Sequence, residues 1–112
     1  MARLPQFDRE QEGALATEER KKTKRPQRFK VLLHNDDYTT MDFVVYVLIK
    51  HFRKSHAEAT QIMLHVHHRG AGVAGIYPKE AAETKAAEVM AEAREQGMPL
   101  LVTLEPAEPG DE

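Results

Sequence analysis

Apolar residues are distributed very unevenly along this chain of 112 residues, and that distribution limits what it can fold into. Residues 1–25 are rich in charged side chains and contain few large apolar ones. Such a segment buries too little apolar surface to offset the entropy lost on ordering. We therefore expect a flexible N-terminal extension over 1–25 and a folded domain over 26–106. Residues 107–112 are rich in proline, glycine and acidic residues, so we expect a frayed C-terminal tail there.

The composition excludes several classes of protein. The net charge of −2 lacks the basic excess typical of nucleic-acid-binding proteins, so we expect no nucleic-acid partner. The absence of cysteine excludes disulfides, cysteine-ligated zinc and cysteine nucleophiles. No apolar run approaches the roughly 20 residues of a membrane span, and the N-terminus is charged where a signal peptide would be apolar. We expect a cytoplasmic protein without membrane association, and nothing in the sequence requires more than a monomer.

Hydrophobic periodicity predicts six elements in the order β-α-α-β-α-β. Thr39 with Asp42, and Ser55 with Glu58, have the spacing of capping boxes that open the first two helices. Gly70 is expected to close the second helix. The expected elements cover residues 29–35, 42–53, 55–69, 73–77, 79–96 and 100–104. The apolar face of the last helix consists of Ala82, Ala86, Val89 and Ala93. We expect an α+β fold, in which three helices pack on one face of a three-stranded, mostly antiparallel sheet.

The first candidate for chemistry is the run Asn35, Asp36 and Asp37 between a predicted strand and a predicted helix. Loops held by rigid elements often carry function. Carboxylate and amide oxygens are hydrogen-bond acceptors, so this loop can receive a cationic group. The simpler alternative is a turn that places negative charge at the start of a helix.

The second candidate is a group of histidines, His65, His67 and His68, near the end of the second predicted helix. His65 and His68 are three residues apart, whereas His67 points elsewhere around the helix. Cysteine and a Glu-x-x-His pattern are both absent, so the ligand set of a metal site is incomplete. Histidines near a helix C-terminus are also favoured by the helix dipole alone. We expect no metal site and no cofactor.

The third candidate is the apolar set Met41, Met63, Leu64 and Val66. These residues can simply belong to the core. Methionine is adaptable, however, and recurs at surfaces that accept several apolar ligands. If the two helices bring Met41 beside Met63, a pocket forms with an apolar floor and a polar rim. Such a pocket suits a cationic group attached to a hydrophobic side chain.

The run from Leu33 to Val44 resembles the signature of the ClpS adaptors, which read bacterial N-degrons. The similarity continues through Ala59–His67 and then through Gly70, Gly75, Ala82–Lys85 and Pro99–Leu101. The resemblance implies a non-enzymatic adaptor that binds proteins whose first residue is Leu, Phe, Tyr or Trp. It further implies that the adaptor hands them to the ClpA unfoldase of the ClpAP protease and so modulates which substrates are degraded. The family's extension takes part in delivery to ClpA, in agreement with our interpretation of residues 1–25.

The resemblance also implies roles for individual residues. Asn35, Asp37 and His67 would hold the α-amino group, and Asp36 would support them less directly. The residues implied for the side-chain pocket are Thr39, Met41, Val44, Met63, Val66 and Leu100. Two positions depart from the family pattern, which usually has proline at Thr40 and an aliphatic residue at His34. Thr40 can still cap a helix, and His34 is placed to approach the pocket rim or a partner.

Two other classes of function remain open from the residues alone. Asp37 and His67 can be read as the acid/base pair of a small hydrolase, although no recognisable nucleophile or oxyanion hole accompanies them. A plain interaction domain without specificity for protein N-termini is the other alternative. Binding of free-amine against acetylated peptides separates this domain from the adaptor, and peptide turnover separates either of them from the enzyme.

Overall fold

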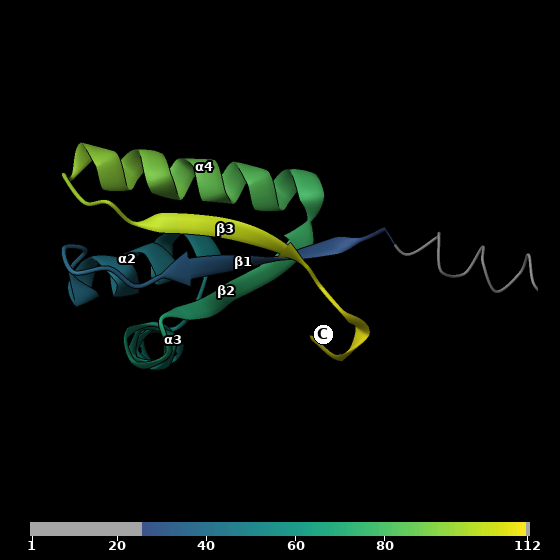
Figure 1. The fold of residues 1–112 in the computed structure, drawn as a ribbon, viewed down its shortest axis with the longest axis horizontal. Helices are drawn as coiled ribbons and strands as arrows, with labels where there is room; N and C mark the ends of the chain where they lie inside the picture. The colour runs from purple at the N-terminus through teal and green to yellow at the C-terminus, as the bar shows by residue number, and fades with distance from the viewer. Residues whose placement is uncertain (1–25, 112) are drawn as a thin grey trace, which may run out of the picture.

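In the computed structural model, which describes residues 26–111, three strands form one antiparallel sheet in the order β2-β1-β3. The central strand β1 (Arg28–His34) pairs with β2 (Ala71–Pro78) and with β3 (Leu101–Pro106). Three helices pack on one face of the sheet: α2 (Met41–Phe52), α3 (His56–Arg69) and α4 (Lys79–Glu95). In Figure 1, α4 runs along β3, and α3 lies beside β2. The predicted fold class and element order are confirmed, while the extension predicted for residues 1–25 lies outside the described residues.

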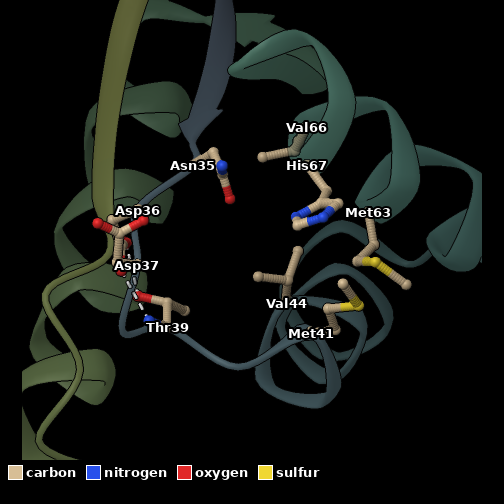
Figure 2. Close-up of a pocket in the computed structure, with 9 residues that line it drawn as sticks. All are labelled: Asn35, Asp36, Asp37, Thr39, Met41, Val44, Met63, Val66 and His67. Atoms are coloured by element: carbon tan, nitrogen blue, oxygen red, sulfur yellow. Dashed lines mark hydrogen bonds between the residues drawn. The ribbon is translucent and has the colours of Figure 1, made fainter.

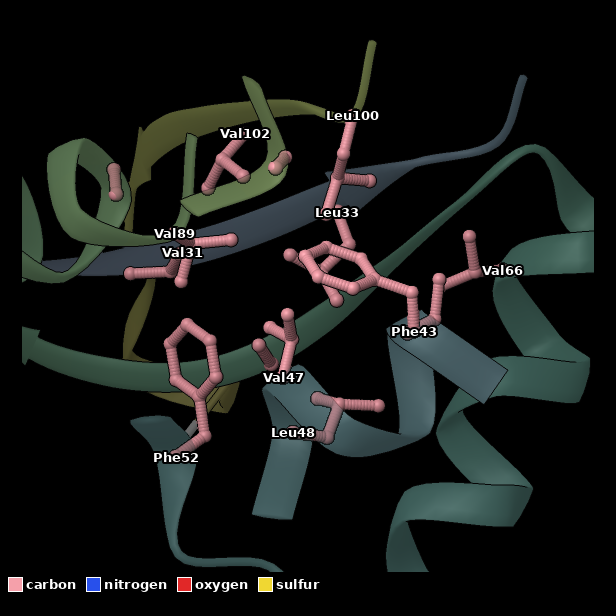
Figure 3. Close-up of a cluster of buried hydrophobic side chains, with 14 of the residues drawn as sticks. Val31, Leu33, Phe43, Val47, Leu48, Phe52, Val66, Val89, Leu100 and Val102 are labelled. Atoms are coloured by element: carbon pink, nitrogen blue, oxygen red, sulfur yellow. The ribbon is translucent and has the colours of Figure 1, made fainter. Parts of the chain in front are cut away.

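The alternation of β1 determines which side of the sheet is buried. Val31 and Leu33 are fully buried, and Lys30, Leu32 and His34 between and beside them point to the other face. The buried face packs against apolar residues from all three helices, as Figure 3 shows. The face predicted for α4 is confirmed, because Ala82, Ala86, Val89 and Ala93 are all buried. Their small side chains let the helix approach the sheet closely.

The two helices that flank the site begin at side-chain caps. Ser55 and Glu58 form the predicted capping box of α3. The capping box predicted from Thr39 and Asp42 is wrong by one residue, because Thr40 is the N-cap of α2 and its hydroxyl accepts from the Phe43 N–H at 3.1 Å. The Thr39 hydroxyl is unavailable for capping, since it donates to Asp36. Helix α3 ends as predicted at Gly70, whose φ of 95° lies in the left-handed region that favours glycine.

Strand β2 begins at Ala71, earlier than the predicted start at Val73. Residues Ala71 and Gly72 lack β-forming side chains, but they pair with His34 and Leu33 of β1, and this ladder makes them a strand. The register of the pair shifts between Val31 and Leu32, as at a β-bulge. The helix predicted over 79–96 and the strand predicted over 100–104 are shifted by one or two residues at their ends.

The C-terminal residues fold back toward the start of β1. The Ala107 N–H donates to the Arg28 carbonyl at 2.8 Å, and the Lys30 Nζ lies 3.3 Å from Asp111 Oδ2. A short 3-10 turn, η1 (Pro109–Asp111), positions this carboxylate. The fraying expected of residues 107–112 stays a prediction, since these contacts do not measure it. Within the described residues, none of the helices has the length and apolar character that spanning a bilayer requires.

Candidate functional site

The loop that follows β1 meets the C-terminal end of α3. The Asn35 N–H donates to the Gly70 carbonyl at 2.8 Å, so the first residue of the loop is fixed to the residue that ends the helix. This bond is possible because Gly70 turns the chain sharply out of α3. The same contact brings Asn35 close to the last turn of α3, where His67 is located. Two segments distant in sequence thus meet at one edge of the sheet.

The loop itself is organised by the carboxylate of Asp36. Oδ1 accepts from the N–H groups of Tyr38 and Thr39 at 2.7 and 2.6 Å, and Oδ2 accepts from the Thr39 hydroxyl at 2.7 Å. Partial burial raises the pKa of the Asp36 carboxyl, but the hydrogen bonds from Thr39 and Tyr38 outweigh it and hold the pKa below its ordinary value. Asp36 is therefore ionised at neutral pH.

A cavity of about 230 Å³ lies between this loop and the helices α2 and α3. Its volume is below the range of about 300–1,000 Å³ that drug-sized ligands occupy, so it suits a single residue and not a long peptide. Figure 2 shows its lining. The lining residues are Asn35, Asp36, Asp37, Thr39, Met41, Val44, Met63, Val66 and His67.

The pocket has a polar part and an apolar part. In Figure 2 the side chains of Asn35 and His67 point toward one another across it. Asp37 is exposed on the loop and adds a carboxylate to the rim. Among the described residues, no lysine or arginine lines the pocket, so no cationic side chain there offsets the negative charge of its two aspartates. The arrangement can accept a positively charged group beside an apolar one.

The apolar part comes from facing residues of α2 and α3. Val44 and Val66 are buried, with 7% and 3% of their surface exposed, and they close the base of the pocket. Met41 and Met63 lie beside one another in Figure 2, which is the condition under which the sequence predicted a pocket. Met41 retains 45% exposure, which places it at the opening and leaves it free to contact a ligand.

Nine of the predicted site residues thus meet in one cavity, but Leu100 does not. Leu100 is 4% exposed and lies in the core shown in Figure 3. His34 does not approach the rim, because its Nε2 lies 2.7 Å from the Thr103 hydroxyl oxygen on β3.

The histidines near the end of α3 do not form part of a metal-binding cluster among the described residues. The rings of His67 and His68 meet edge to face, with centroids 5.2 Å apart. Residues 26–111 contain no group of three or more side chains placed to hold a metal ion.

Sequence reasoning missed the importance of Gly72 for this site. A Cβ built on Gly72 would lie 2.8 Å from Cγ2 of Val66, so only glycine lets α3 settle this closely on β2. The signal was present in the sequence, because a glycine inside a strand often marks the close approach of another segment.

Fold and pocket together define a small α+β binding protein whose pocket has a polar and an apolar part. Residues 24–103 match the family model described as "ATP-dependent Clp protease adaptor protein ClpS". The chain therefore belongs to the ClpS family of Clp protease adaptors, and the predicted resemblance is confirmed.

Individual relatives agree with this assignment. The ClpS adapter protein of Desulfatibacillum aliphaticivorans is 58% identical over 94 residues, which cover 84% of this chain and 90% of that protein. The ClpS adapter protein of Oleidesulfovibrio alaskensis is 61% identical over 82 residues, covering 73% of this chain and 79% of that one. Among solved structures, Agrobacterium tumefaciens ClpS2 bound to L-phenylalaninamide matches with a TM-score of 0.72 and 41% identity. The match extends over 100% of that chain and 74% of this one.

Proposed function

We propose that this protein is an N-degron adaptor. It binds proteins that begin with Leu, Phe, Tyr or Trp, and it delivers them to the ClpA unfoldase of ClpAP in the cytoplasm. The observation that carries the proposal is the pocket, in which the acceptors Asn35, Asp37 and His67 adjoin an apolar cavity sized for one side chain. An N-terminal residue is the one position of a polypeptide where a free ammonium lies beside an apolar side chain.

The polar rim suits the ammonium. Asp37 supplies negative charge, Asn35 supplies a carbonyl oxygen, and a neutral His67 supplies a ring nitrogen that accepts a hydrogen bond. Hydrogen bonds to charged groups contribute about 1.5–3 kcal/mol each. An acetylated N-terminus has no positive charge and is bulkier, so the rim also discriminates against blocked and internal residues.

The apolar cavity suits the side chain of the first residue. Burying a Leu or Phe side chain contributes about 1.5–3 kcal/mol, whereas association costs at least about 4 kcal/mol. The balance favours weak to micromolar binding, a range that fits an adaptor that must release its cargo. The bound ligand of the Agrobacterium relative supports this, because L-phenylalaninamide combines a free α-amine with an apolar side chain.

The same geometry argues for binding without catalysis. Thr39 carries a hydroxyl in the pocket, but its partner is the Asp36 carboxylate, whose lowered pKa makes it a weak base. Asp37 and His67 line the rim together, yet no nucleophile stands between them among the described residues that line the pocket. We therefore propose no enzymatic activity and no cofactor.

A degradation assay tests the proposed function. Purified ClpA and ClpP should degrade a fluorescent reporter with N-terminal Phe faster when this protein is added, and the same reporter with N-terminal Ser should not respond. Asp37→Ala should abolish the acceleration. Asp42→Asn is the matched control, because Asp42 lies in the first turn of α2 and does not line the pocket. Equal acceleration of both reporters would contradict the proposal, as would cleavage without ClpA and ClpP.

A further inference from the structure

Two adjacent aspartates line the pocket, but their carboxylates are in opposite situations. Asp36 accepts three hydrogen bonds from Tyr38 and Thr39, all within 2.7 Å. A carboxylate has about four acceptor sites, so little of its capacity is left for a ligand. Asp37 is exposed and has no hydrogen-bond or ion-pair partner among residues 26–111. The structure thus separates one carboxylate that is used internally from one that is free.

From this difference we infer that Asp36 is a positioning residue, which acts through Thr39 and does not contact the ligand's ammonium. The inference rests on the proposed function and deepens it, since it divides the roles of the two aspartates. Asp37 carries the charge that the ammonium meets. Asp36 fixes the backbone on which Asp37 is presented.

The bonds of Asp36 account for how the loop is held. Its carboxylate accepts from the N–H groups of Tyr38 and Thr39 and so closes a turn that contains Asp37. Directly after this turn, Thr40 caps α2, so the position of Met41 at the pocket opening depends on the same turn. At the other end, the bond from Asn35 to Gly70 fixes the loop to α3. A loop fixed at both ends loses less entropy when a ligand binds.

Binding measurements on five variants test this role, with L-phenylalaninamide as the probe in isothermal titration calorimetry. Asp36→Ala should weaken binding by about tenfold or more. Asp36→Asn should weaken it less, because its amide oxygen still accepts from backbone N–H groups. Thr39→Val removes the hydroxyl, and the double variant Asp36→Ala with Thr39→Val should bind no more weakly than the poorer single variant. Asp42→Asn should match wild type.

Hydrogen exchange supplies a readout independent of the ligand. In the unliganded wild type, the Tyr38 and Thr39 amides should exchange slowly, and Asp36→Ala should remove this protection. Asp37→Asn should keep the protection although it loses binding. These amides report on the loop even if a variant is less stable overall, because the amides of β1 serve as an internal reference.

The outcomes distinguish this inference from the proposed function. Wild type that fails to bind L-phenylalaninamide overturns the proposed function. Wild type that binds, with an unchanged affinity in Asp36→Ala, overturns only the positioning role. Additive losses in the double variant also overturn it, because they mean that Asp36 acts on the ligand independently of Thr39.

Discussion

His51 on α2 and Glu92 on α4 join the two helices, since Nε2 of His51 lies 2.8 Å from Oε1 of Glu92. Two other residues of α2 meet the same carboxylate. The Tyr46 hydroxyl donates to Oε2 at 2.5 Å, and the Lys50 Nζ donates to Oε1 at 3.2 Å. These contacts hold the helix that carries Met41 and Val44 of the pocket against α4. Sequence periodicity cannot reveal them, because all four side chains lie outside the apolar stripes.

The first prediction concerns Glu92 and pH. Hydrogen bonds from Tyr46 and then His51 lower the pKa of Glu92 from 4.5 to about 2. A depressed pKa in the folded state means that the ionised form stabilises the fold above about pH 4.5 and that this contribution is lost as the pH falls toward 2. Glu92→Gln should therefore lower the free energy of unfolding at pH 7, and the difference from wild type should shrink through that window.

Urea unfolding at a series of pH values measures this difference. Glu95→Gln is the control, because Glu95 is exposed at the end of the same helix. A Glu92→Gln variant as stable as wild type at pH 7, or one whose deficit persists unchanged at acid pH, would refute the assignment.

The second prediction concerns Gly72. An added methyl group would lie 2.8 Å from Val66 Cγ2 and 3.2 Å from His65 Cδ2, so α3 has to move away from β2. Gly72→Ala should cost about 1–3 kcal/mol of unfolding free energy. It should also weaken L-phenylalaninamide binding, because Val66 and His67 line the pocket. Gly110→Ala, where a Cβ meets nothing within 4 Å, should change neither quantity. Wild-type stability in Gly72→Ala would show that α3 does not depend on this close approach.

The third prediction concerns selectivity at Met41. Leu and Phe branch beyond Cβ and can pass a narrow opening, whereas Ile and Val carry a second heavy atom on Cβ and are stiff at χ1. Met41 lies at the opening and should exclude them by steric contact. Met41→Ala should improve the affinity of Ile- and Val-initial peptides relative to Leu, with some loss for Leu. Fluorescence anisotropy with the three peptides gives the ratios, and an unchanged Leu-over-Ile ratio would exclude Met41 as the selective residue.

The fourth prediction concerns residues 1–25. All residues of the proposed site lie beyond position 26, so deleting 1–25 should leave the affinity for a Phe-initial peptide unchanged. Delivery to ClpA should be impaired, as the family resemblance implies. Anisotropy measures the first quantity and reporter degradation by ClpAP the second. Loss of peptide binding on deletion would mean that the extension belongs to the site and that the proposed domain boundary is misplaced.

The fold was predictable where one face of an element is buried. Val31 and Leu33 on β1, and the alanine face of α4, follow directly from period 2 and period 3.6. The start of β2 was not predictable, because Ala71 and Gly72 become a strand only through pairing with β1. The choice between Thr39 and Thr40 as the cap of α2 depended on Asp36, which takes the Thr39 hydroxyl.

The candidate site was predictable in its membership more than in its internal order. The resemblance implied nine residues that do meet in one cavity. It also implied Leu100, which is buried in the core and does not line the cavity. The sequence Asp36-Asp37 does not show which carboxylate accepts hydrogen bonds from the loop and which one has no partner among the described residues. That difference arises from loop geometry, which spacing alone does not determine.

Calorimetry with a matched pair of ligands tests most directly whether the pocket recognises a free α-amine beside an apolar side chain. L-Phenylalaninamide and its N-acetyl derivative share the side chain and differ in the ammonium. Wild type should bind the first and show no measurable heat with the second, and Asp37→Ala should lose most of the affinity for the first. Equal affinity for the two ligands would contradict the account.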